Sequence, residues 1–276
     1  MKPAAFVYAR ARSLDEAIAL LREAPGEARL LAGGQSLMPA LNMRLDAPKL
    51  VIDINGIGLD GISRKNGQVE IGALTRHATA ERSAIVADMA PLIAKAMPHI
   101  GHPAIRNRGT VGGSIANADP AAELPACLLA LDGEVEIAGP AGRRAVKAGD
   151  FFKGLYETAL GDEDVLIAIR VPAASADRRY GFGELCRRHG DYALVGLAAS
   201  ARADGQRLQD VRLAFFGVGA TPVRARKAEA ALAAGSVDDA VAALDLAPGD
   251  DVHASGAYKK HAAGVLLRRV ATELAA

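Results

Sequence analysis

Residues 29–45, RLLAGGQSLMPALNMRL, are the stretch that most constrains what this chain can fold into. Arg29–Leu31 predict the end of a short buried strand, and Pro39 predicts the start of a helix. The intervening Gly33 and Gly34 let the backbone approach a ligand and take positive φ. Backbone N–H groups in such a turn bind anions. The stretch predicts a phosphate or pyrophosphate site, with a plain strand-to-helix turn as the alternative.

Residues 108–120, RGTVGGSIANADP, have the same character. Gly112 and Gly113 precede the hydroxyl of Ser114, and helix-favouring residues begin near Pro120. Two such turns suggest one long ligand held at two places, and a dinucleotide fits that arrangement better than a mononucleotide. The chain has no GxxxxGK[ST] motif, and GVGATP does not match the GxGxxG fingerprint, so neither a P-loop nor a Rossmann site is predicted.

Length and composition narrow the class of protein. The 276 residues allow two domains, or one domain with subdomains, and half of them are apolar. A net charge of +1 gives no reason to expect nucleic acid as a partner. No apolar run approaches the ~20 residues of a membrane span, and the N-terminus has no secretory signal. We therefore expect a cytoplasmic protein without a membrane span.

The cysteines and histidines predict no metal ligand and no catalytic residue. Two cysteines are too few for an iron–sulfur cluster, which needs about four thiolates. Cys127 lies in an apolar run and is expected in the core, whereas Cys186 precedes two arginines whose charges would lower its pKa. His99 and His102 are flanked by prolines, which argues against a helical metal-binding pair.

The periodicity predicts three consecutive units. The first, residues 1–56, reads strand, helix, strand, helix, strand, with a capping box from Ser13 to Glu16 and a last strand at 49–54. The second, residues 57–173, is expected to hold a hairpin around 65–67, a helix that Thr75 caps and that runs to about residue 86, and further elements at 89–97, 120–131, 134–137 and 165–171.

The third unit, residues 178–276, follows a short stretch with the composition of a linker. Apolar segments at 180–188, 192–203 and 208–218, two of them joined by Asp204–Gly205, predict a three-stranded antiparallel sheet. Three helices should follow, at 225–234, 236–244 and 255–276.

The two glycine turns also carry a resemblance. AGGQSLMP, followed about 75 residues later by TVGGSIANADP and then by GDYALVGLAA, resembles the FAD-binding medium subunit of the molybdenum hydroxylases, the xanthine dehydrogenase and carbon monoxide dehydrogenase relatives. The resemblance covers nearly the whole chain. It implies an α+β fold: a PCMH-type FAD-binding domain of two α/β subdomains, then a C-terminal domain of a three-stranded antiparallel sheet and a helical bundle.

The resemblance also implies the cofactor site. It assigns FAD contacts to the two glycine turns, to an acidic residue near the adenosine, and to an aromatic residue beside the isoalloxazine. These residues are Leu31, Ala32, Gly33, Gly34, Gln35, Ser36, Leu37, Ile100, Gly101, Thr110, Val111, Gly112, Gly113, Ser114, Glu123, Leu166 and Tyr192. Glu123 also suits a helix N-terminus, and Tyr192 also suits the core at a strand start. Some relatives contact the flavin through a lysine, but Gly183 and Glu184 stand in that region.

The implied function is electron transfer through FAD. Relatives with covalently attached flavin carry a histidine in the first glycine turn. This chain has none there, so the resemblance implies that its FAD is bound non-covalently. A molybdenum-cofactor large subunit and a [2Fe-2S] small subunit are the implied partners, in a heterotrimer or its dimer. Two alternatives stay open: a self-sufficient flavin oxidase of the same fold, and a nucleotide-binding module without redox activity. The substrate, carbon monoxide, an N-heterocycle or an aldehyde, belongs to the molybdenum subunit.

Overall fold

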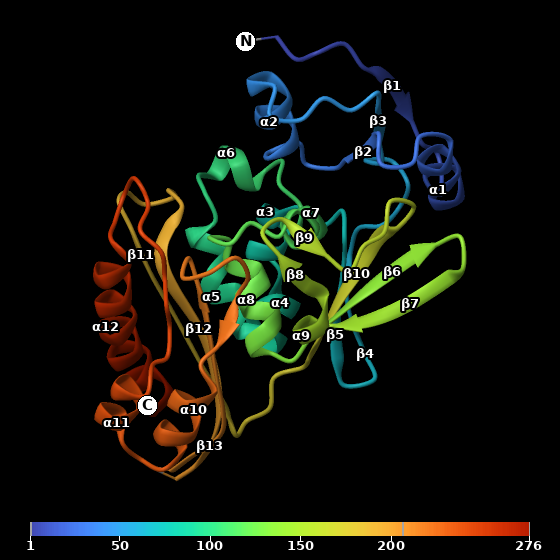
Figure 1. Cartoon of the computed structure of the whole chain (residues 1–276). Coiled ribbons are helices and arrows are strands. Elements are labelled where there is room, and N and C mark those ends of the chain that lie inside the picture. The colour runs from blue at the N-terminus through green and yellow to red at the C-terminus, as the bar shows by residue number, and fades with distance from the viewer. Residues whose placement is uncertain (1, 206, 276) are drawn as a thin grey trace.

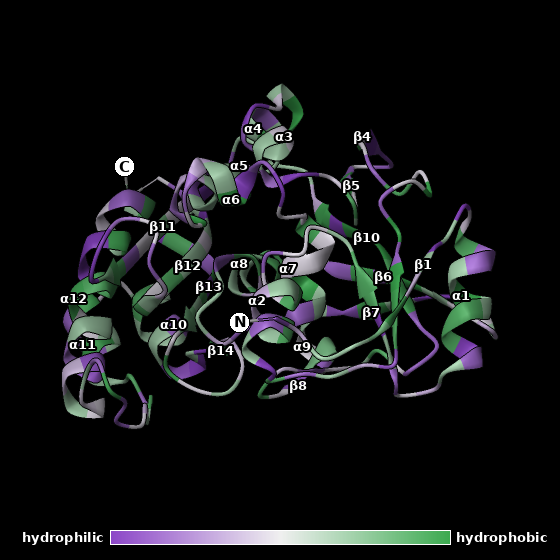
Figure 2. Cartoon of the chain, turned by 90° about the horizontal axis from the view of Figure 1, so that it is seen from above, coloured by the Kyte–Doolittle hydropathy of each residue, from purple (hydrophilic) through white to green (hydrophobic). Residues whose placement is uncertain are grey.

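The computed structural model describes residues 2–205 and 207–275. Three positions used in the predictions lie outside the described residues: the domain ends Met1 and Ala276, and Gln206 in the predicted hairpin. Figure 1 shows the N-terminal part in blue, a middle part in cyan to yellow-green, and the C-terminal part in ochre, orange and red. In Figure 2 the helices α7 (Val111–Asn117) and α8 (Glu123–Ala130) lie between two large sheets, one in the middle part and one in the C-terminal part.

The N-terminal part is a three-stranded parallel sheet in the order β1-β3-β2. Its elements are β1 (Val7–Arg10), α1 (Leu14–Glu23), β2 (Ala28–Leu31), α2 (Leu37–Met43) and β3 (Leu50–Asp53). The Ser13 side chain accepts a hydrogen bond from Glu16 N, as predicted, but the Glu16 carboxylate accepts from Arg12 N at 2.7 Å rather than from Ser13 N. Helix α2 begins two residues before Pro39, so the predicted start was late.

The middle part is built on a five-stranded sheet in the order β4-β5-β10-β6-β7. The strands are β4 (Ile62–Lys65), β5 (Gln68–Gly72), β6 (Glu134–Gly139), β7 (Gly142–Lys147) and β10 (Val165–Pro172), with a separate pair β8 (Phe152–Gly154) and β9 (Glu157–Thr158). The helices are α3 (His77–Glu81), α4 (Ala84–Met89), α5 (Pro91–Ala96), η1 (Met97–His99), α6 (Pro103–Arg106), α7 (Val111–Asn117), α8 (Glu123–Ala130) and α9 (Ala148–Phe151).

Two helix predictions in this part were wrong. Thr75 caps no helix, because its Oγ1 is used by the backbone N–H and carbonyl of Gly61, both at 3.0 Å. The predicted single helix is instead two short ones, and Ser83 caps the second by accepting from Val86 N. The second glycine pair lies inside the first turn of α7, and the helix expected from Pro120 begins at Glu123.

The C-terminal part confirms the three long antiparallel strands, and a two-residue strand extends the sheet. The strands are β11 (Arg178–Cys186), β12 (Ala193–Asp204), β13 (Arg207–Phe216) and β14 (Val223–Arg224), and the helices are α10 (Arg226–Ala233), α11 (Val237–Ala242) and α12 (Gly256–Ala275). Helix α12 packs on one face of the sheet, and α5 and α8 pack on the other (Figure 1). Because both faces are covered, eight of the twelve residues of β12 are buried.

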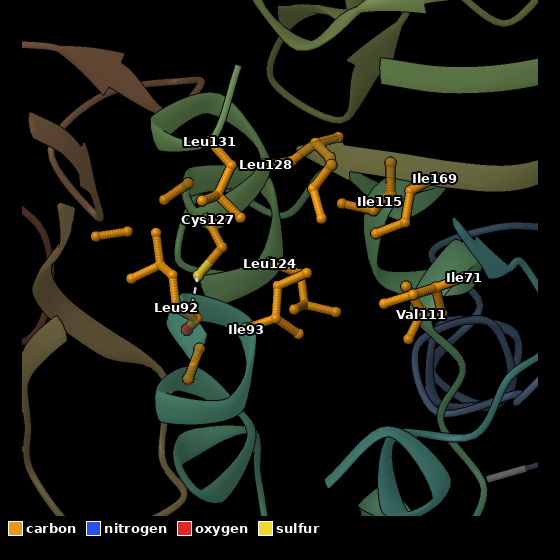
Figure 3. Packing of buried hydrophobic residues seen from close by; sticks show 14 of the residues in the cluster. Ile71, Leu92, Ile93, Val111, Ile115, Leu124, Cys127, Leu128, Leu131 and Ile169 are labelled. Carbon is orange, nitrogen blue, oxygen red and sulfur yellow. Dashed lines mark hydrogen bonds between the residues drawn. The ribbon is translucent and has the colours of Figure 1, made fainter. Parts of the chain in front are cut away.

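The main hydrophobic core joins the middle and C-terminal parts. Figure 3 shows its centre, where Leu92 and Ile93 of α5 meet Leu124, Cys127 and Leu128 of α8. Cys127 is fully buried, as the sequence predicts, and its Sγ lies 3.9 Å from the Leu92 carbonyl oxygen. The same core includes apolar residues of β11, β12 and β13, so the C-terminal sheet is packed against the middle part rather than merely tethered to it.

Candidate cofactor site

The first glycine turn connects β2 to α2 and presents free backbone donors. Within residues 2–205 and 207–275, the N–H groups of Gly33, Gly34, Gln35 and Ser36 find no acceptor. Gly34 takes φ +71°, and the Gln35 side chain donates to the Gly33 carbonyl at 3.1 Å, which fixes the turn. The Ser36 side chain caps no helix N–H, so its hydroxyl is available to a ligand. These successive donors form the concavity that binds anions.

The two glycine turns touch each other. A Cβ on Gly33 would lie 2.5 Å from the carbonyl oxygen of Arg108 and 2.8 Å from the Cα of Gly109. No side chain other than hydrogen fits between two backbones at that separation. The structure therefore brings the predicted turns together, from positions about 75 residues apart in the chain.

The second turn differs from the first because its backbone donors are already used. Val111 N donates to Thr75 O at 2.9 Å, Gly112 N to Ala73 O at 2.8 Å, and Gly113 N to the Thr110 side chain at 3.1 Å. Ser114 N donates to Thr110 O, as in any helix start. The prediction of an N–H cradle thus fits the first turn, whereas the glycines of the second turn serve close packing: a Cβ on Gly112 would meet Ala73 at 2.5 Å.

A hydrogen-bonded bridge joins the two turns. Asn55 donates to the carbonyls of Leu31 and Ala32 at 3.3 and 2.8 Å. Its side-chain oxygen accepts from the Arg76 guanidinium at 2.6 Å, and the same guanidinium donates to the carbonyl of Arg108. The sequence does not predict this bridge, since nothing local marks an asparagine and an arginine 21 residues apart as partners.

A second group of predicted residues lies at the other end of α7. That helix has seven residues, so it spans about 10 Å. Gly101 (φ +53°) meets the loop before β12, because a Cβ on Gly190 would lie 2.8 Å from the Gly101 carbonyl oxygen. In that loop the Tyr192 side chain is 67% exposed, which excludes the core position that was the alternative for it.

Glu123 is the first residue of α8 and is buried. Burial, together with the like charges of Glu184 and Asp119, raises the pKa of Glu123 to about 8. Burial therefore favours the protonated form of the Glu123 carboxyl group. Ile100 and Leu166 are buried apolar residues of the main core.

The prediction that neighbouring arginines lower the pKa of Cys186 was wrong. Burial and the carboxylate of Glu184 raise the pKa of the Cys186 thiol instead. Arg187 pairs with Asp191 at 3.0 Å and does not act on the thiol. A thiol held in its protonated form is a poor nucleophile, so Cys186 is not a reactive group.

The geometry suits a long anion with an aromatic end. The first turn supplies N–H groups that have no acceptor in the described part of the chain, and its Gly33 leaves no room for a Cβ. The far group supplies an exposed tyrosine and a buried carboxyl group whose pKa is raised. FAD, with a diphosphate in its middle and an isoalloxazine at one end, fits these features.

Comparison with known proteins identifies the family to which this chain belongs. The family model described as the FAD binding domain in molybdopterin dehydrogenase matches residues 4–174, and that of the CO dehydrogenase flavoprotein C-terminal domain matches residues 180–274. The chain therefore belongs to the FAD-binding medium subunits of the xanthine dehydrogenase and carbon monoxide dehydrogenase family, and it is an oxidoreductase subunit.

The similarity to individual relatives extends over nearly the full length of this chain. The chain is 36% identical to the 6-hydroxypseudooxynicotine dehydrogenase complex subunit alpha of Paenarthrobacter nicotinovorans, over 98% of this chain and 94% of that protein. It is 37% identical to the carbon monoxide dehydrogenase medium chain of Hydrogenophaga pseudoflava, over 98% and 96%. A solved structure of carbon monoxide dehydrogenase from Hydrogenophaga pseudoflava matches with a TM-score of 0.96 at 38% identity, covering 99% of this chain and 98% of that one.

The fold class predicted from the sequence is confirmed by these matches. The division at residues 1–56, 57–173 and 178–276 stays a prediction. No helix in the described part of the chain has the length and apolar composition to cross a membrane.

Proposed function

We propose that this chain binds FAD non-covalently and relays electrons from a [2Fe-2S] subunit to an acceptor, within a molybdenum hydroxylase. The observation that carries the proposal is the first glycine turn. Four successive backbone N–H groups there find no acceptor among the described residues, and the turn lies against the second one. Such an arrangement stabilises a diphosphate and has no evident structural role of its own.

Each part of the site takes one task in this proposal. The donors of Gly33–Ser36 and the Ser36 hydroxyl hold the diphosphate, and Leu31, Leu37 and Leu166 supply the apolar surroundings. Residues Thr110–Ser114 allow the rest of the diphosphate and the ribityl chain to lie against the backbone. Tyr192 stacks on the isoalloxazine, and Ile100, Gly101 and Glu123 contact the cofactor at this same end. In this proposal Glu123 therefore lies nearer the flavin ring than the adenosine that the resemblance implied, because Glu123 and Tyr192 lie close enough for the charge of one to act on the other.

When bound, FAD supplies the redox chemistry, accepting electrons and passing them on in pairs. The chain itself binds and orients the cofactor and shields it from water. Neither a catalytic dyad nor an activated nucleophile is needed for this, and the thiol with the raised pKa, Cys186, offers none.

The proposal requires partner subunits. This chain has two cysteines, and the pair is split between a buried position in α8 and a partly buried one in β11, so it cannot hold an iron–sulfur cluster alone. Several relatives are named as medium chains or as subunits of complexes. We infer a molybdenum-cofactor large subunit and a [2Fe-2S] small subunit, in a heterotrimer or its dimer located in the cytoplasm.

The test is the absorption spectrum of the chain purified with the subunits encoded beside it. Flavin bands near ~450 nm, with intact FAD released by acid, are the expected result. A colourless complex that takes up no added FAD would overturn the proposal in favour of a non-redox nucleotide-binding module. Flavin reduction by an organic substrate with the chain alone would instead favour a self-sufficient oxidase.

A further inference from the structure

Arg106, the last residue of α6, is a buried arginine that holds the loop of residues 98–102 from inside the protein. Its Nε donates to Glu81 Oε2 at 2.9 Å. Its Nη1 donates to the carbonyl oxygens of Gly101 at 3.0 Å and Ile100 at 3.3 Å, and lies 3.5 Å from that of Pro98. A guanidinium is costly to bury unless its charge is paired and its N–H groups find acceptors, and Arg106 meets both conditions.

The carbonyl groups that Arg106 holds decide where the neighbouring N–H groups point. In a planar trans peptide unit the C=O and the N–H lie on opposite sides, and the described residues contain no cis peptide bond. Because the carbonyls of Ile100 and Gly101 point at Arg106, the N–H groups of Gly101 and His102 point away from it. Neither N–H group finds an acceptor among the described residues. The loop therefore presents two adjacent donors on the side opposite the guanidinium.

The carbonyl side of the loop is closed by packing. Gly101 takes φ +53°, a conformation that favours glycine. A Cβ on Gly190 would lie 2.8 Å from the Gly101 carbonyl oxygen and 2.9 Å from His102 Nδ1. The Gly101 carbonyl is thus enclosed between the Arg106 guanidinium and the backbone of the loop that carries Tyr192. The free donors lie on the side that this packing leaves uncovered.

We propose that Arg106 is a positioning residue of the cofactor site: it holds this loop so that the N–H groups of Gly101 and His102 donate to the isoalloxazine of FAD. The inference rests on the proposed function, which places Gly101 and Tyr192 at the isoalloxazine end. One edge of the isoalloxazine carries carbonyl oxygens and ring nitrogens, which accept hydrogen bonds. Arg106 acts through the loop, since its side chain is buried and its Nε and Nη1 are already bonded.

The first test needs no variant. The full chain, freed of flavin and labelled with nitrogen-15, is titrated with FAD while its backbone amides are followed by NMR. The amide protons of Gly101 and His102 should move downfield and exchange with solvent at least about tenfold more slowly, because they gain an acceptor. Gly33 and Gly34 report on the diphosphate end in the same titration. Gly149, which has open space around it, should not respond.

The same titration separates the inference from the proposed function. A response at Gly33 and Gly34 without one at Gly101 and His102 would overturn the inference and leave FAD binding standing. No response at either place would overturn the proposed function itself, and the positioning role with it.

The second test asks whether Arg106 sets these donors. In Arg106→Gln the dissociation constant for FAD should rise about tenfold to thirtyfold, since two hydrogen bonds lose their alignment. The amide responses of Gly101 and His102 should shrink, while those of the first turn persist. Arg106→Lys keeps the charge beside Glu81 but lacks the fork that reaches the loop carbonyls as well, so it should restore stability more than these amide responses.

The matched control is Arg224→Gln, which removes another arginine–glutamate pair with little exposure, the one with Glu229 in the C-terminal part. This variant should lower thermal stability and leave FAD affinity at the wild-type value. A wild-type affinity and wild-type amide responses in Arg106→Gln would contradict the positioning role. So would a loss of affinity in Arg224→Gln equal to that in Arg106→Gln, since it would trace both losses to stability alone. If Arg106→Gln does not fold, the amides of the wild-type chain and of Arg106→Lys decide.

Discussion

At the residue scale, one hydrogen atom on Gly33 decides whether the two turns can meet. Of the predicted site, the sequence identifies the glycines well, because only glycine tolerates the close approach that both turns require. It does not identify Asn55, Arg76 or Arg106, which are ordinary polar residues until the fold gives them partners. It also misjudges Cys186, since sequence neighbours do not reveal that a buried carboxylate lies beside the thiol.

Replacing Gly33 by alanine should separate the turns. The new Cβ would lie 2.5 Å from Arg108 O, and that carbonyl belongs to backbone that cannot rotate away. We expect a loss of about 1–3 kcal/mol in stability and a marked loss of bound FAD. Thermal unfolding and flavin content measure both. Gly149→Ala, whose Cβ would meet nothing within 4 Å, is the control; equal stability of the two variants would contradict the argument.

His77 predicts a loss of stability in acid. Both ring nitrogens are buried without a hydrogen-bond partner among the described residues, and burial lowers the pKa of His77 to about 4. In the unfolded chain the His77 imidazole therefore binds a proton below about pH 6.5, whereas in the folded chain it does so only below about pH 4. Stability is full above this window and should fall by up to about 3 kcal/mol as the pH drops through it.

Denaturant unfolding at about pH 7 and about pH 5 checks this expectation. His77→Leu, which cannot be protonated, should lose less stability between the two conditions than the wild type does. His261→Gln, on the exposed side of α12, should behave like the wild type. The same loss in all three proteins would show that another group titrates.

At the element scale, most strands could be predicted from the sequence, whereas helix boundaries could not. The hairpin at 65–67 forms because Asn66 and Gly67 both adopt positive φ, as the turn chemistry predicts. The helix expected from Thr75 failed because a tertiary hydrogen bond to Gly61 outcompetes the cap. The short strands β7, β8 and β9 were missed, since their exposed and irregular sequences carry no alternating pattern.

The guanidinium of Arg76 connects two elements: it donates to Asn55, just after β3, and to the carbonyl of Arg108 in the second turn. Arg76→Met removes the donors to Asn55 and to Arg108 O, and should cost about 1–3 kcal/mol and weaken FAD binding. Arg76→Lys keeps the charge but lacks the fork that reaches both acceptors, so it should rescue little. Flavin titration and thermal unfolding measure these effects.

The control for Arg76 is Arg64→Met, an exposed position on β4. A double-mutant cycle with Asn55→Ala isolates the bridge, because the two changes should be less than additive if both act through it. Full additivity would show that Arg76 and Asn55 stabilise the protein independently.

At the scale of the whole molecule, the shared core was not predictable. The sequence divides the chain after residue 173, yet Phe182, Ala198, Ala214 and Phe216 of the C-terminal sheet lie in one core with the middle part. Apolar periodicity shows which residues are buried, but not against which partner.

Phe216 tests whether that core unfolds as one unit. Its side chain is fully buried and stacks on Phe182 with ring centroids 5.9 Å apart. Phe216→Ala should cost about 3–5 kcal/mol and lower a single, common transition of both parts. Calorimetry distinguishes this from two transitions of which only one moves. Val252→Ala, at a side chain that is 93% exposed, should change nothing.

The C-terminal sheet packs against α5 and α8 of the middle part, and this packing limits which C-terminal regions could be exchanged between members of the family. The first family model ends at residue 174 and the second begins at residue 180, so a graft of one relative's C-terminal region onto another would naturally be joined between them. Such a hybrid would inherit α5 and α8 from one parent and the facing surface of β11–β13 from the other. Because those two surfaces pack together in one core, viable hybrids should come from parents whose residues on the two surfaces match in volume.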